Sequence, residues 1–494
     1  MSVRVLHVGA ELYPLLKTGG LADVLGALPQ AQIELGTDAR VLLPGFPSVI
    51  AGLEGLREVA RIAPVFGVDN ATIEFGILRG GVNADEAGLG IYVIRADVFY
   101  QRAGSPYVDV TNRPYDDNIW RFALLGWTAA QLAQSADASW RPDIVHAHDW
   151  HAALAPAYLR AAGEMKGAPI VPCIMTVHNL AYQGLFPAAQ WNGLRLPDHY
   201  FDIEGLEFYG QISFLKAGLH YADRITTVSP NYAREIQTAE HGAGLHGLLK
   251  RRTQELSGIL NGVDYTVWNP LNDSSIVATY GATRLREKAK NKGALQKRLG
   301  LKVDSETLLF GVVSRLTQQK GFDLLLEAVP EIVKRGGQLA VLGTGEPPLE
   351  AGLRRAVHAH PEAVGVHLGF DEALAHLVTA GSDVIMVPSR FEPCGLTQLY
   401  ALAYGSLPLV HGVGGLADTV FDASLENLAD GFATGFVFER FEHQALVAAI
   451  RRAFALHARP FDWRRTQQCA MQQIFGWESA AQRYLELYQA LQKP

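Results

Sequence analysis

The sequence is poor in cysteine, has no long apolar run and has no excess of positive charge. Its 494 residues include only three cysteines, Cys173, Cys394 and Cys469, and no C-x-x-C pair. This usage points away from a disulfide framework and favours free thiols in a reducing compartment. No apolar stretch approaches the roughly 18 residues of a membrane span. The formal net charge of −7 argues against nucleic acid as the main partner.

The first residues of the chain already form a strand pattern, Val3–Val8. We therefore expect no leader segment, a cytoplasmic location and no membrane association. A chain of this length exceeds one ordinary core, so two or three domains are expected. Nothing in the sequence indicates the oligomeric state.

Short β-rich runs alternate with helical patterns along nearly the whole chain, which predicts an α/β protein with parallel sheets. Strands are expected at 3–8, 39–43, 91–94, 144–146, 173–177, 225–228, 308–313, 338–342, 364–368, 384–387 and 407–410. The turn-rich segment 258–264 is typical of a hinge. We predict two doubly wound Rossmann-like domains, 1–257 and 258–475, facing across a central cleft, and a last helix within 476–494 that crosses back to the first domain.

Two further patterns bear on this organisation. The pentapeptide Gly-Gly-Leu-Ala-Asp occurs at 19–23 and again at 414–418, each time where a loop enters a helix. This repeat favours two facing lobes that each present backbone amides to one cleft, and chance recurrence is the alternative. The segment Arg284–Arg298 carries seven basic residues and one acidic residue, Glu287. Short charge runs usually lie on a solvated helix face, and we expect that here.

The segment Pro388–Gln398 follows a predicted strand and enters a predicted helix. This arrangement puts Glu392 at the carboxyl end of a parallel sheet, where open α/β folds bind ligands. The backbone amides of Gly395, Leu396 and Thr397 lie at the start of the helix, which favours an anion. A carboxylate beside an anion-binding helix end suits a sugar nucleotide, which carries hydroxyls and phosphates.

Two other loops bring cations to strand ends. Lys17 precedes Gly19 and Gly20, and paired glycines let a backbone approach a ligand closely. A plain strand-to-helix turn with an exposed lysine is the alternative. Arg315 ends a predicted strand and Lys320 precedes the next helix, which suggests a diphosphate clamp that needs no metal. A structural ion pair is the alternative at that place.

Histidines gather after another strand, in the segment His146–His151. Their order, H-x-H-D-x-H, with no second ligand set downstream, favours polar lining over a metal site. His178 and Asn179 end the next strand at the same sheet edge, where they would point at a bound sugar. Buried structural hydrogen bonding is the alternative. Among the aromatic residues of the first half we expect most rings in the core, and Tyr100 and Tyr107 exposed for sugar stacking.

Six motifs together resemble the family of bacterial glycogen synthases and plant starch synthases. They are Lys17–Val24, His146–His151, Val177–Gly184, Asn261–Asp264, Ser314–Gly321 and Ser389–Gln398. The resemblance covers essentially the entire chain and implies a GT-B fold. It implies transfer of glucose from ADP-glucose to the non-reducing 4-hydroxyl of glycogen or another α-1,4-glucan, with retention at the anomeric carbon. No cofactor and no metal are expected.

The resemblance also implies roles for individual residues. Glu392 would bind the transferred glucose or stabilise charge at its anomeric carbon, and Arg315 and Lys320 would hold the departing diphosphate. Phe370 would meet the adenine. The remaining donor and sugar contacts would come from Glu11, Lys17, Gly19, Gly20, Asp23, Tyr100, Asp149, His178, Asn179, Asn261, Cys394, Gly395, Leu396 and Thr397.

Three positions depart from the family pattern. Phe370 stands where many relatives have tyrosine, so stacking remains but a hydroxyl is lost. Val413 replaces a threonine that usually precedes the second pentapeptide. Related retaining transferases often have a second glutamate eight residues after the first. This chain has Tyr400 at that position, as does the glycogen synthase branch of the family. The sequence offers a single carboxylate and no evident nucleophile. We therefore expect the acceptor hydroxyl to attack the anomeric carbon from the same face that the diphosphate leaves, with the leaving phosphate assisting its deprotonation.

Three other functions compete with this one. The same fold could use UDP-glucose or a small sugar phosphate. A catalytically silent glucan-binding protein is expected to have lost Lys17, Arg315, Lys320 or Glu392, and all four are present. A metal-dependent hydrolase would use the histidines of the segment His146–His151.

Overall fold

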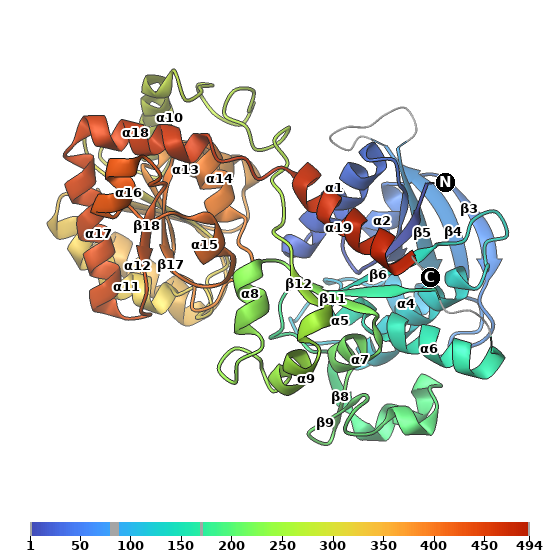
Figure 1. Ribbon diagram of the computed structural model, residues 1–494. Coiled ribbons are helices and arrows are strands. Elements are labelled where there is room, and N and C mark those ends of the chain that lie inside the picture. The colour runs from blue at the N-terminus through green and yellow to red at the C-terminus, as the bar shows by residue number, and fades with distance from the viewer. Residues whose placement is uncertain (1, 80–87, 168–170, 493–494) are drawn as a thin grey trace. The chain divides into compact units, whose positions relative to one another are not determined.

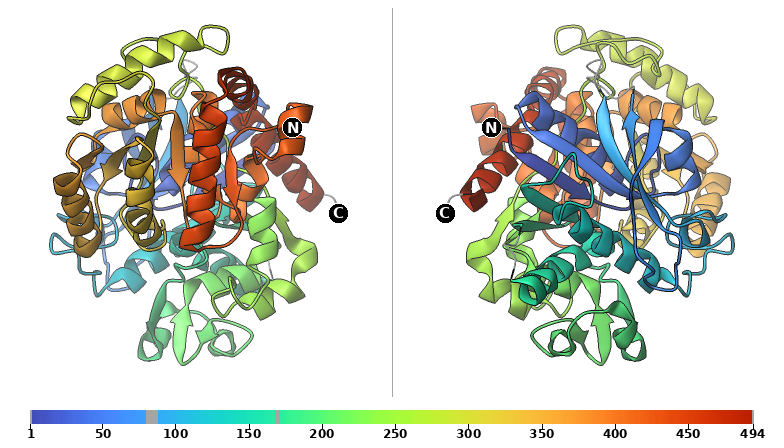
Figure 2. Two further views of the ribbon diagram at one scale, coloured as in Figure 1. Left: turned by 90° about the vertical axis from the view of Figure 1, so that its left-hand side faces the viewer. Right: turned by 90° about the vertical axis from the view of Figure 1, so that its right-hand side faces the viewer.

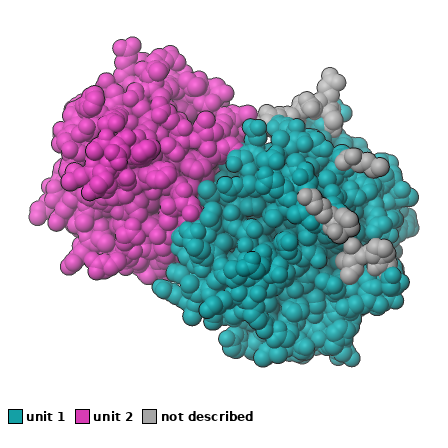
Figure 3. All heavy atoms as spheres, in the orientation of Figure 1, with its two compact units in different colours: residues 1–262, 477–494 teal, residues 263–476 magenta. Residues whose placement is uncertain are grey.

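The computed structural model describes residues 2–79, 88–167 and 171–492. The chain divides into two compact units. Residues 1–262 with 477–494 form unit 1, and residues 263–476 form unit 2 (Figure 3). The division at 262/263 falls inside the turn-rich segment 258–264. None of the helices in the described ranges has the length and apolar character of a membrane-spanning segment.

Unit 1 is built on a nine-stranded sheet in the order β12-β11-β7-β6-β1-β2-β5-β4-β3. Its strands are β1 (Arg4–Val8), β2 (Asp38–Pro44), β3 (Glu54–Arg61), β4 (Thr72–Leu78), β5 (Leu89–Arg95), β6 (Ile144–His148), β7 (Cys173–Val177), β11 (Arg224–Thr227) and β12 (Leu256–Gly258). The right-hand view of Figure 2 shows the twist of its first strands in blue. Every strand expected in the first half is present.

The expectation of purely parallel pairing is wrong at one edge of this sheet. Strands β3 and β4 pair antiparallel with each other, and β4 pairs antiparallel with β5. The outermost strand, β3, is mostly exposed and has register shifts. A solvent-facing edge strand has no need of a continuous apolar run, so its sequence carries little strand signal.

Helices cover both faces of the unit 1 sheet. They are α1 (Gly20–Glu34), α2 (Pro47–Ala51), α3 (Asp97–Tyr100), α4 (Asn118–Ala133), α5 (Asp149–Ala152), α6 (Leu154–Lys166), α7 (Phe214–Tyr221), α8 (Pro230–Glu235), α9 (His246–Arg251) and α19 (Trp477–Gln492). A small sheet of β8 (Leu185–Pro187), β10 (Gln211–Ser213) and β9 (Glu207–Phe208) is added. The last helix, α19, lies beside α1 (Figure 1).

Unit 2 is built on a six-stranded parallel sheet in the order β15-β14-β13-β16-β17-β18. Its strands are β13 (Leu309–Val313), β14 (Gln338–Gly343), β15 (Val364–Leu368), β16 (Val384–Val387), β17 (Leu407–His411) and β18 (Phe436–Phe438). Its helices are α10 (Lys288–Arg298), α11 (Phe322–Lys334), α12 (Pro347–Ala359), α13 (Glu372–Gly381), α14 (Thr397–Ala403), α15 (Gly414–Thr419), α16 (Leu425–Asp430), α17 (His443–His457) and α18 (Pro460–Met471). Two α/β units with Rossmann-like sheets confirm the expected fold class.

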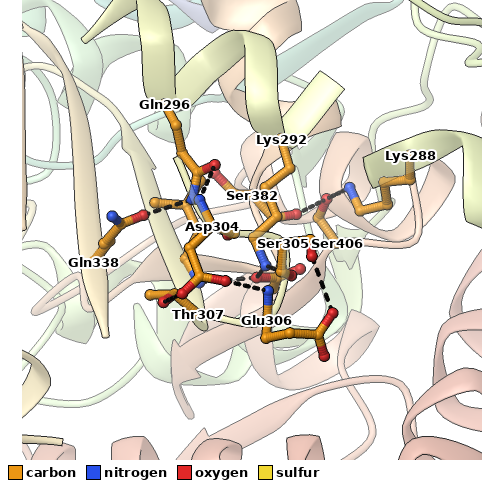
Figure 4. A network of polar contacts seen from close by, with 12 residues as sticks. Lys288, Lys292, Gln296, Asp304, Ser305, Glu306, Thr307, Gln338, Ser382 and Ser406 are labelled. Atoms are coloured by element: carbon orange, nitrogen blue, oxygen red, sulfur yellow. Dashed lines mark hydrogen bonds and ion pairs between the residues drawn. The ribbon is translucent and has the colours of Figure 1, made fainter. Parts of the chain in front are cut away.

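The basic segment Arg284–Arg298 is not a wholly solvated face. Lys288 and Lys292 are buried, at 5% and 4% exposure. Lys288 donates hydrogen bonds to Ser406 Oγ (Figure 4) and to Ala380 O, both at 2.6 Å. Burial lowers the pKa of Lys288 to about 7. Lys292 forms an ion pair of 2.7 Å with Asp383. The expectation of solvated lysines is therefore wrong for these two, because specific acceptors compensate their burial.

Candidate functional site

In unit 2, Glu392 lies in the loop between β16 and α14 and is 6% exposed. Its Oε2 accepts hydrogen bonds from Lys320 Nζ at 2.6 Å and from Ser389 Oγ at 2.8 Å. Ser389 is in turn held by His411, whose Nδ1 lies 2.8 Å from Ser389 O. The carboxylate is therefore oriented by two donors at the carboxyl ends of adjacent strands, β13 and β16.

The loops after β13 and β16 approach each other backbone to backbone. Arg390 N donates to Gln319 O at 2.8 Å. Gly321 has φ +71°, and a Cβ there would lie 1.9 Å from Pro388 O. Only glycine combines this backbone conformation with such a close approach. The position of Lys320 next to Glu392 thus depends on a glycine one residue further along.

The second pentapeptide copy packs against the same carboxylate loop. Gly415 N donates to Glu392 O at 3.1 Å and to Pro393 O at 3.2 Å. A Cβ at Gly414, which has φ +47°, would lie 1.9 Å from Glu392 O. These glycines of α15 therefore fix the backbone that carries Glu392. Next in the chain, Cys394 is buried and Gly395 has φ +73°, and α14 begins at Thr397 after Leu396.

Two further predicted residues of unit 2 are exposed. Phe370 follows β15 and is 82% exposed, so its ring is accessible. Arg315 is exposed at the end of β13 and forms no ion pair with any described residue. Tyr400, which stands where a second carboxylate would be, stacks on Trp268 with ring centroids 3.9 Å apart. The carboxylate of Glu392 is therefore the acidic group that this loop presents.

In unit 1, the loop that leads into α1 is organised by Glu11, which is 3% exposed. Its carboxylate accepts hydrogen bonds from Thr18 Oγ1 at 2.6 Å, from Gly19 N at 3.3 Å and from the hydroxyl of Tyr107. Burial and the charge of Glu11 raise the pKa of Tyr107, so this hydroxyl stays a donor. A Cβ at Gly19 would meet no described atom within 4 Å.

Lys17 of this loop pairs with Asp23 in the first turn of α1. Lys17 is exposed, and its Nζ lies 2.7 Å from Asp23 Oδ1. Gly20, also exposed, begins α1. An exposed pair of this kind contributes little to stability and leaves the lysine able to meet another anion.

Of the two tyrosines expected to be exposed, Tyr100 is a core residue, so that expectation is wrong. It is 1% exposed, and its hydroxyl donates to Arg121 O at 2.6 Å. Its ring packs edge-on against Phe46. A buried ring with a satisfied hydroxyl is typical of core. Tyr107 is half-buried and holds Glu11.

Asp149 occupies the first position after β6 and is 6% exposed. It has φ +60°, which Asp tolerates better than most residues. Burial raises the pKa of Asp149 to about 8, although the amides of Trp150, Asn179 and His178 favour the charged form. Its Oδ1 has no hydrogen-bond partner among the described residues. A hydroxyl of a ligand would satisfy this atom.

His178 and Asn179 follow β7 and are half-buried. The structure brings His178 next to His148, with 3.1 Å between His178 Nε2 and His148 Nδ1. Burial lowers the pKa of His178 to about 3, so the ring is neutral. Asn179 Oδ1 accepts a hydrogen bond from Ala181 N at 3.1 Å. Asn261 is buried, at 8% exposure, near the end of unit 1.

Sequence reasoning missed several residues around these groups. His7 lies beside His146 and His148, and one ligand atom from each of the three lies within 4.8 Å of the others. His151 is not part of that group. Ser389 stands inside a motif but its bond to Glu392 was not foreseen. A signal existed for His7, since it interrupts an otherwise apolar strand near its carboxyl end, as His146 and His148 do in β6.

These groups suit the cleavage of a bond between a sugar and a phosphate. Unit 2 provides a buried carboxylate for positive charge and nearby cations for negative charge. Residues 4–251 match the family model of the starch synthase catalytic domain, and residues 295–467 match that of glycosyl transferases group 1. With its two Rossmann-like units, the protein is a glycosyltransferase of the GT-B fold class.

Similar proteins define the family further. The glycogen synthase of Francisella tularensis subsp. novicida (strain U112) is 53% identical over 490 residues, 99% of each chain. That of Francisella tularensis subsp. holarctica (strain FTNF002-00 / FTA) is 52% identical over 490 residues, again 99% of each chain. The chain belongs to the glycogen synthase family.

Solved structures agree with this assignment. The catalytic domain of starch synthase IV from Arabidopsis thaliana, bound to ADP and acarbose, has a TM-score of 0.87 and 31% identity, over 99% of each chain. Sucrose-phosphate synthase from Thermosynechococcus elongatus has a TM-score of 0.57 and 17% identity, over 99% of each chain, which speaks for the fold alone.

Replacing Gly321 tests the backbone contact that positions Lys320. We expect Gly321→Ala to lower stability by about 1–3 kcal/mol beyond the backbone strain itself, because its Cβ would strike Pro388 O. Activity should fall about 10- to 100-fold, since small displacements of reacting groups are costly. Gly300→Ala is the matched control, because Gly300 also has φ +71° but its Cβ would meet nothing within 4 Å. Equal thermal midpoints for both variants would contradict the steric argument.

The raised pKa of Asp149 predicts a pH dependence of stability. Between pH 3.8 and about 8 the unfolded chain loses a proton that folded Asp149 keeps. Stability from this group is therefore present at low pH and lost as pH rises, by about 1.4 kcal/mol per pH unit at most. Asp149→Asn removes this dependence. The thermal midpoint of the variant should therefore rise relative to that of the parent as the pH increases from 4 to 8. A constant difference between the two proteins would show that Asp149 ionises normally.

Proposed function

We propose that the chain elongates glycogen by transferring glucose from ADP-glucose to the non-reducing 4-hydroxyl of an α-1,4-glucan, with retention of configuration. The observation that carries the proposal is the buried Glu392 carboxylate held by Lys320, together with exposed Arg315 in the same loop after β13 as Lys320. Support comes from the names of the Francisella relatives and from the ADP and acarbose of the Arabidopsis starch synthase. We also propose that the enzyme works in the cytoplasm.

Charge separation explains the proposed use of unit 2. Breaking the bond from glucose to the diphosphate leaves positive charge on the sugar and negative charge on the phosphate. Glu392 stabilises the first, and Arg315 and Lys320 stabilise the second. Because Arg315 has no ion pair among the described residues, it can bind a diphosphate without first breaking one. Phe370 stacks on the adenine, and Cys394 and the amides of Gly395, Leu396 and Thr397 line the donor.

Unit 1 supplies sugar contacts in this proposal. Asp149 Oδ1 accepts a hydrogen bond from a sugar hydroxyl, which satisfies a buried oxygen that otherwise lacks a partner. His178, Asn179 and Asn261 complete the sugar contacts. Open space beside Gly19 lets the Lys17 loop approach a ligand, with Gly20 and Asp23 beside it and Glu11 holding its shape.

No covalent intermediate is needed. Glu392 is the only carboxylate of its loop, and Tyr400 stacks on Trp268 in place of a second one. The leaving phosphate takes the proton of the acceptor hydroxyl as the new bond forms on the same face of the sugar. No metal takes part, because the cations supply the charge that a metal would supply. Trapping of a glucosyl group on any side chain would contradict this mechanism.

The direct test measures incorporation of labelled glucose into glycogen from ADP-glucose and from UDP-glucose, with EDTA present. We expect incorporation from ADP-glucose that EDTA does not reduce. Glu392→Ala should lower kcat more than it raises KM for the donor, because Glu392 acts on developing charge. Preference for UDP-glucose would show that the donor is UDP-glucose and not ADP-glucose. Glycogen binding without transfer from either donor would indicate a silent binding protein, and loss of activity in EDTA would indicate metal-dependent chemistry.

The clamp assignment has its own test. We expect Lys320→Ala and Arg315→Ala each to lower kcat about 10²- to 10³-fold, as loss of a single transition-state donor does in other enzymes. Lys334→Ala is the matched control, since Lys334 is exposed in the last turn of α11 and far along the helix from the clamp. Rates within tenfold of the parent for both clamp variants would remove Arg315 and Lys320 from the mechanism.

A further inference from the structure

A row of polar side chains lies on one face of the unit 1 sheet. Register pairs His7 with His146, and His148 with Thr176. Thr176 pairs in turn with Thr226. Because side chains alternate along a strand, these residues point to the same face. They are all 0% exposed. A helix pair, α1 and α19, covers this face, with Tyr484 and Tyr488 of α19 in its apolar cluster.

Hydrogen bonds join this row into a chain that ends at His178. Gln32 Oε1 lies 2.7 Å from His7 Nε2. His7 Nδ1 lies 3.0 Å from His148 Nε2, and His148 Nδ1 lies 3.1 Å from His178 Nε2. Each link therefore uses one nitrogen of each ring it joins. The nitrogen left over at the end is His178 Nδ1.

Because its imidazole rings are neutral, all hydrogen bonds of this chain must run in the same direction. Burial lowers the pKa of His7 to about 4 and that of His178 to about 3, and lowers the pKa of His148 well below its usual value. A neutral ring carries one N–H and one bare nitrogen. When Gln32 Oε1 accepts from His7 Nε2, His7 Nδ1 is bare and must accept from His148 Nε2. His148 Nδ1 must then accept from His178 Nε2.

The Gln32 amide also bonds to Tyr488, on the side away from His7. Gln32 Nε2 donates to the Tyr488 hydroxyl at 3.0 Å. That hydroxyl lies 2.7 Å from His146 Nδ1, and His146 Nε2 lies 2.6 Å from Thr176 Oγ1. Turning the amide over would reverse every link and put a hydrogen on His178 Nδ1. The observed orientation, with Gln32 Oε1 toward His7 and Nε2 toward Tyr488, corresponds to one of these two mutually exclusive arrangements, the one with the hydrogen on His178 Nε2.

We propose that Gln32 and Tyr488 act through His7 and His148 to hold His178 with its hydrogen on Nε2, so that bare Nδ1 accepts a hydrogen bond from a sugar hydroxyl. Gln32, Tyr488, His7 and His148 are positioning residues in this account. The last helix of the chain then contributes to the site without touching the substrate. The identity of the sugar rests on the proposed function, whereas the state of the His178 ring does not.

The same histidines do not suit a metal. Both ring nitrogens of His7, His146 and His148 already have hydrogen-bond partners. The group of possible ligands that the described residues form contains no carboxylate. A divalent cation there would be buried without a compensating charge, which is strongly unfavourable.

The first measurement is made on the unmodified enzyme without substrate. Long-range proton–nitrogen NMR of histidine-labelled protein distinguishes Nδ1–H from Nε2–H rings, and His178→Gln assigns the signal of His178. We expect His178, His148 and His7 to be neutral Nε2–H rings at pH 7.5. A hydrogen on His178 Nδ1, or a charged ring, would overturn the proposal. This readout needs no catalytic turnover, so it stands even if the proposed reaction fails.

The second measurement removes the residue that orients Gln32. In Tyr488→Phe the amide loses one of its two hydrogen-bond partners and can turn over more easily, so we expect a second His178 ring form in the NMR spectrum. In the glucose-transfer assay kcat should fall about three- to tenfold, the equivalent of one net hydrogen bond. Tyr158→Phe is the matched control, because Tyr158 is also buried in unit 1 and, among the described residues, its hydroxyl donates to Leu194 O at 2.9 Å and not to the histidine chain. Its kcat and its His178 signal should match the parent.

Two outcomes would refute the positioning role. One is a single unchanged His178 ring form with unchanged kcat in Tyr488→Phe. The other is an equal loss of kcat in Tyr488→Phe and Tyr158→Phe, which would reflect general weakening of unit 1. Gln32→Met, which keeps the volume of the side chain and removes both polar atoms, must give the same mixed ring forms as Tyr488→Phe. A single form in that variant would equally count against the proposal.

Discussion

The close backbone approach of two loops in unit 2 is the constraint on which its chemistry depends. Gly321 lies where a Cβ would be 1.9 Å from Pro388 O, and Gly414 lies where a Cβ would be 1.9 Å from Glu392 O. With these glycines in place, Lys320 reaches Glu392 and the carboxylate is held in one orientation. At these points the glycines of the motifs permit close backbone packing within the protein. They affect a ligand indirectly, because this packing preorganises the charged groups.

Unit 1 buries many polar side chains behind the residues of the candidate site. His7, His146 and His148 are fully buried, yet each ring nitrogen has a partner. A buried network that is completely satisfied is rigid and has few alternative arrangements. Burial also keeps the imidazoles neutral, which makes their hydrogen bonds directional. The helix α19 closes this network with Tyr488, so the end of the chain and the residues after β7 form one connected system.

Much of the fold could be predicted because parallel strands buried on both faces carry strong apolar signals. The fully buried strands β7 and β16 occur at the expected residues. The exposed edge strand β3 carries no such signal. Residue type also gave a wrong prediction of burial at two positions. Tyr100 is core although tyrosine can stack on sugars, and Lys288 is buried although lysine is usually solvated. In both cases the deciding factor is a partner far away in sequence.

The α/β class, most strands and the loops that carry Glu392, Lys320 and His178 follow from local patterns in the sequence. Which side chains meet depends on how the chain folds. The order of strands brings β1 beside β6, so His7 joins histidines more than a hundred residues away, at 141 positions in the case of His148. The contact of Gln32 with Tyr488 spans 456 positions. Such pairings arise from chain topology, which local propensity and spacing do not encode.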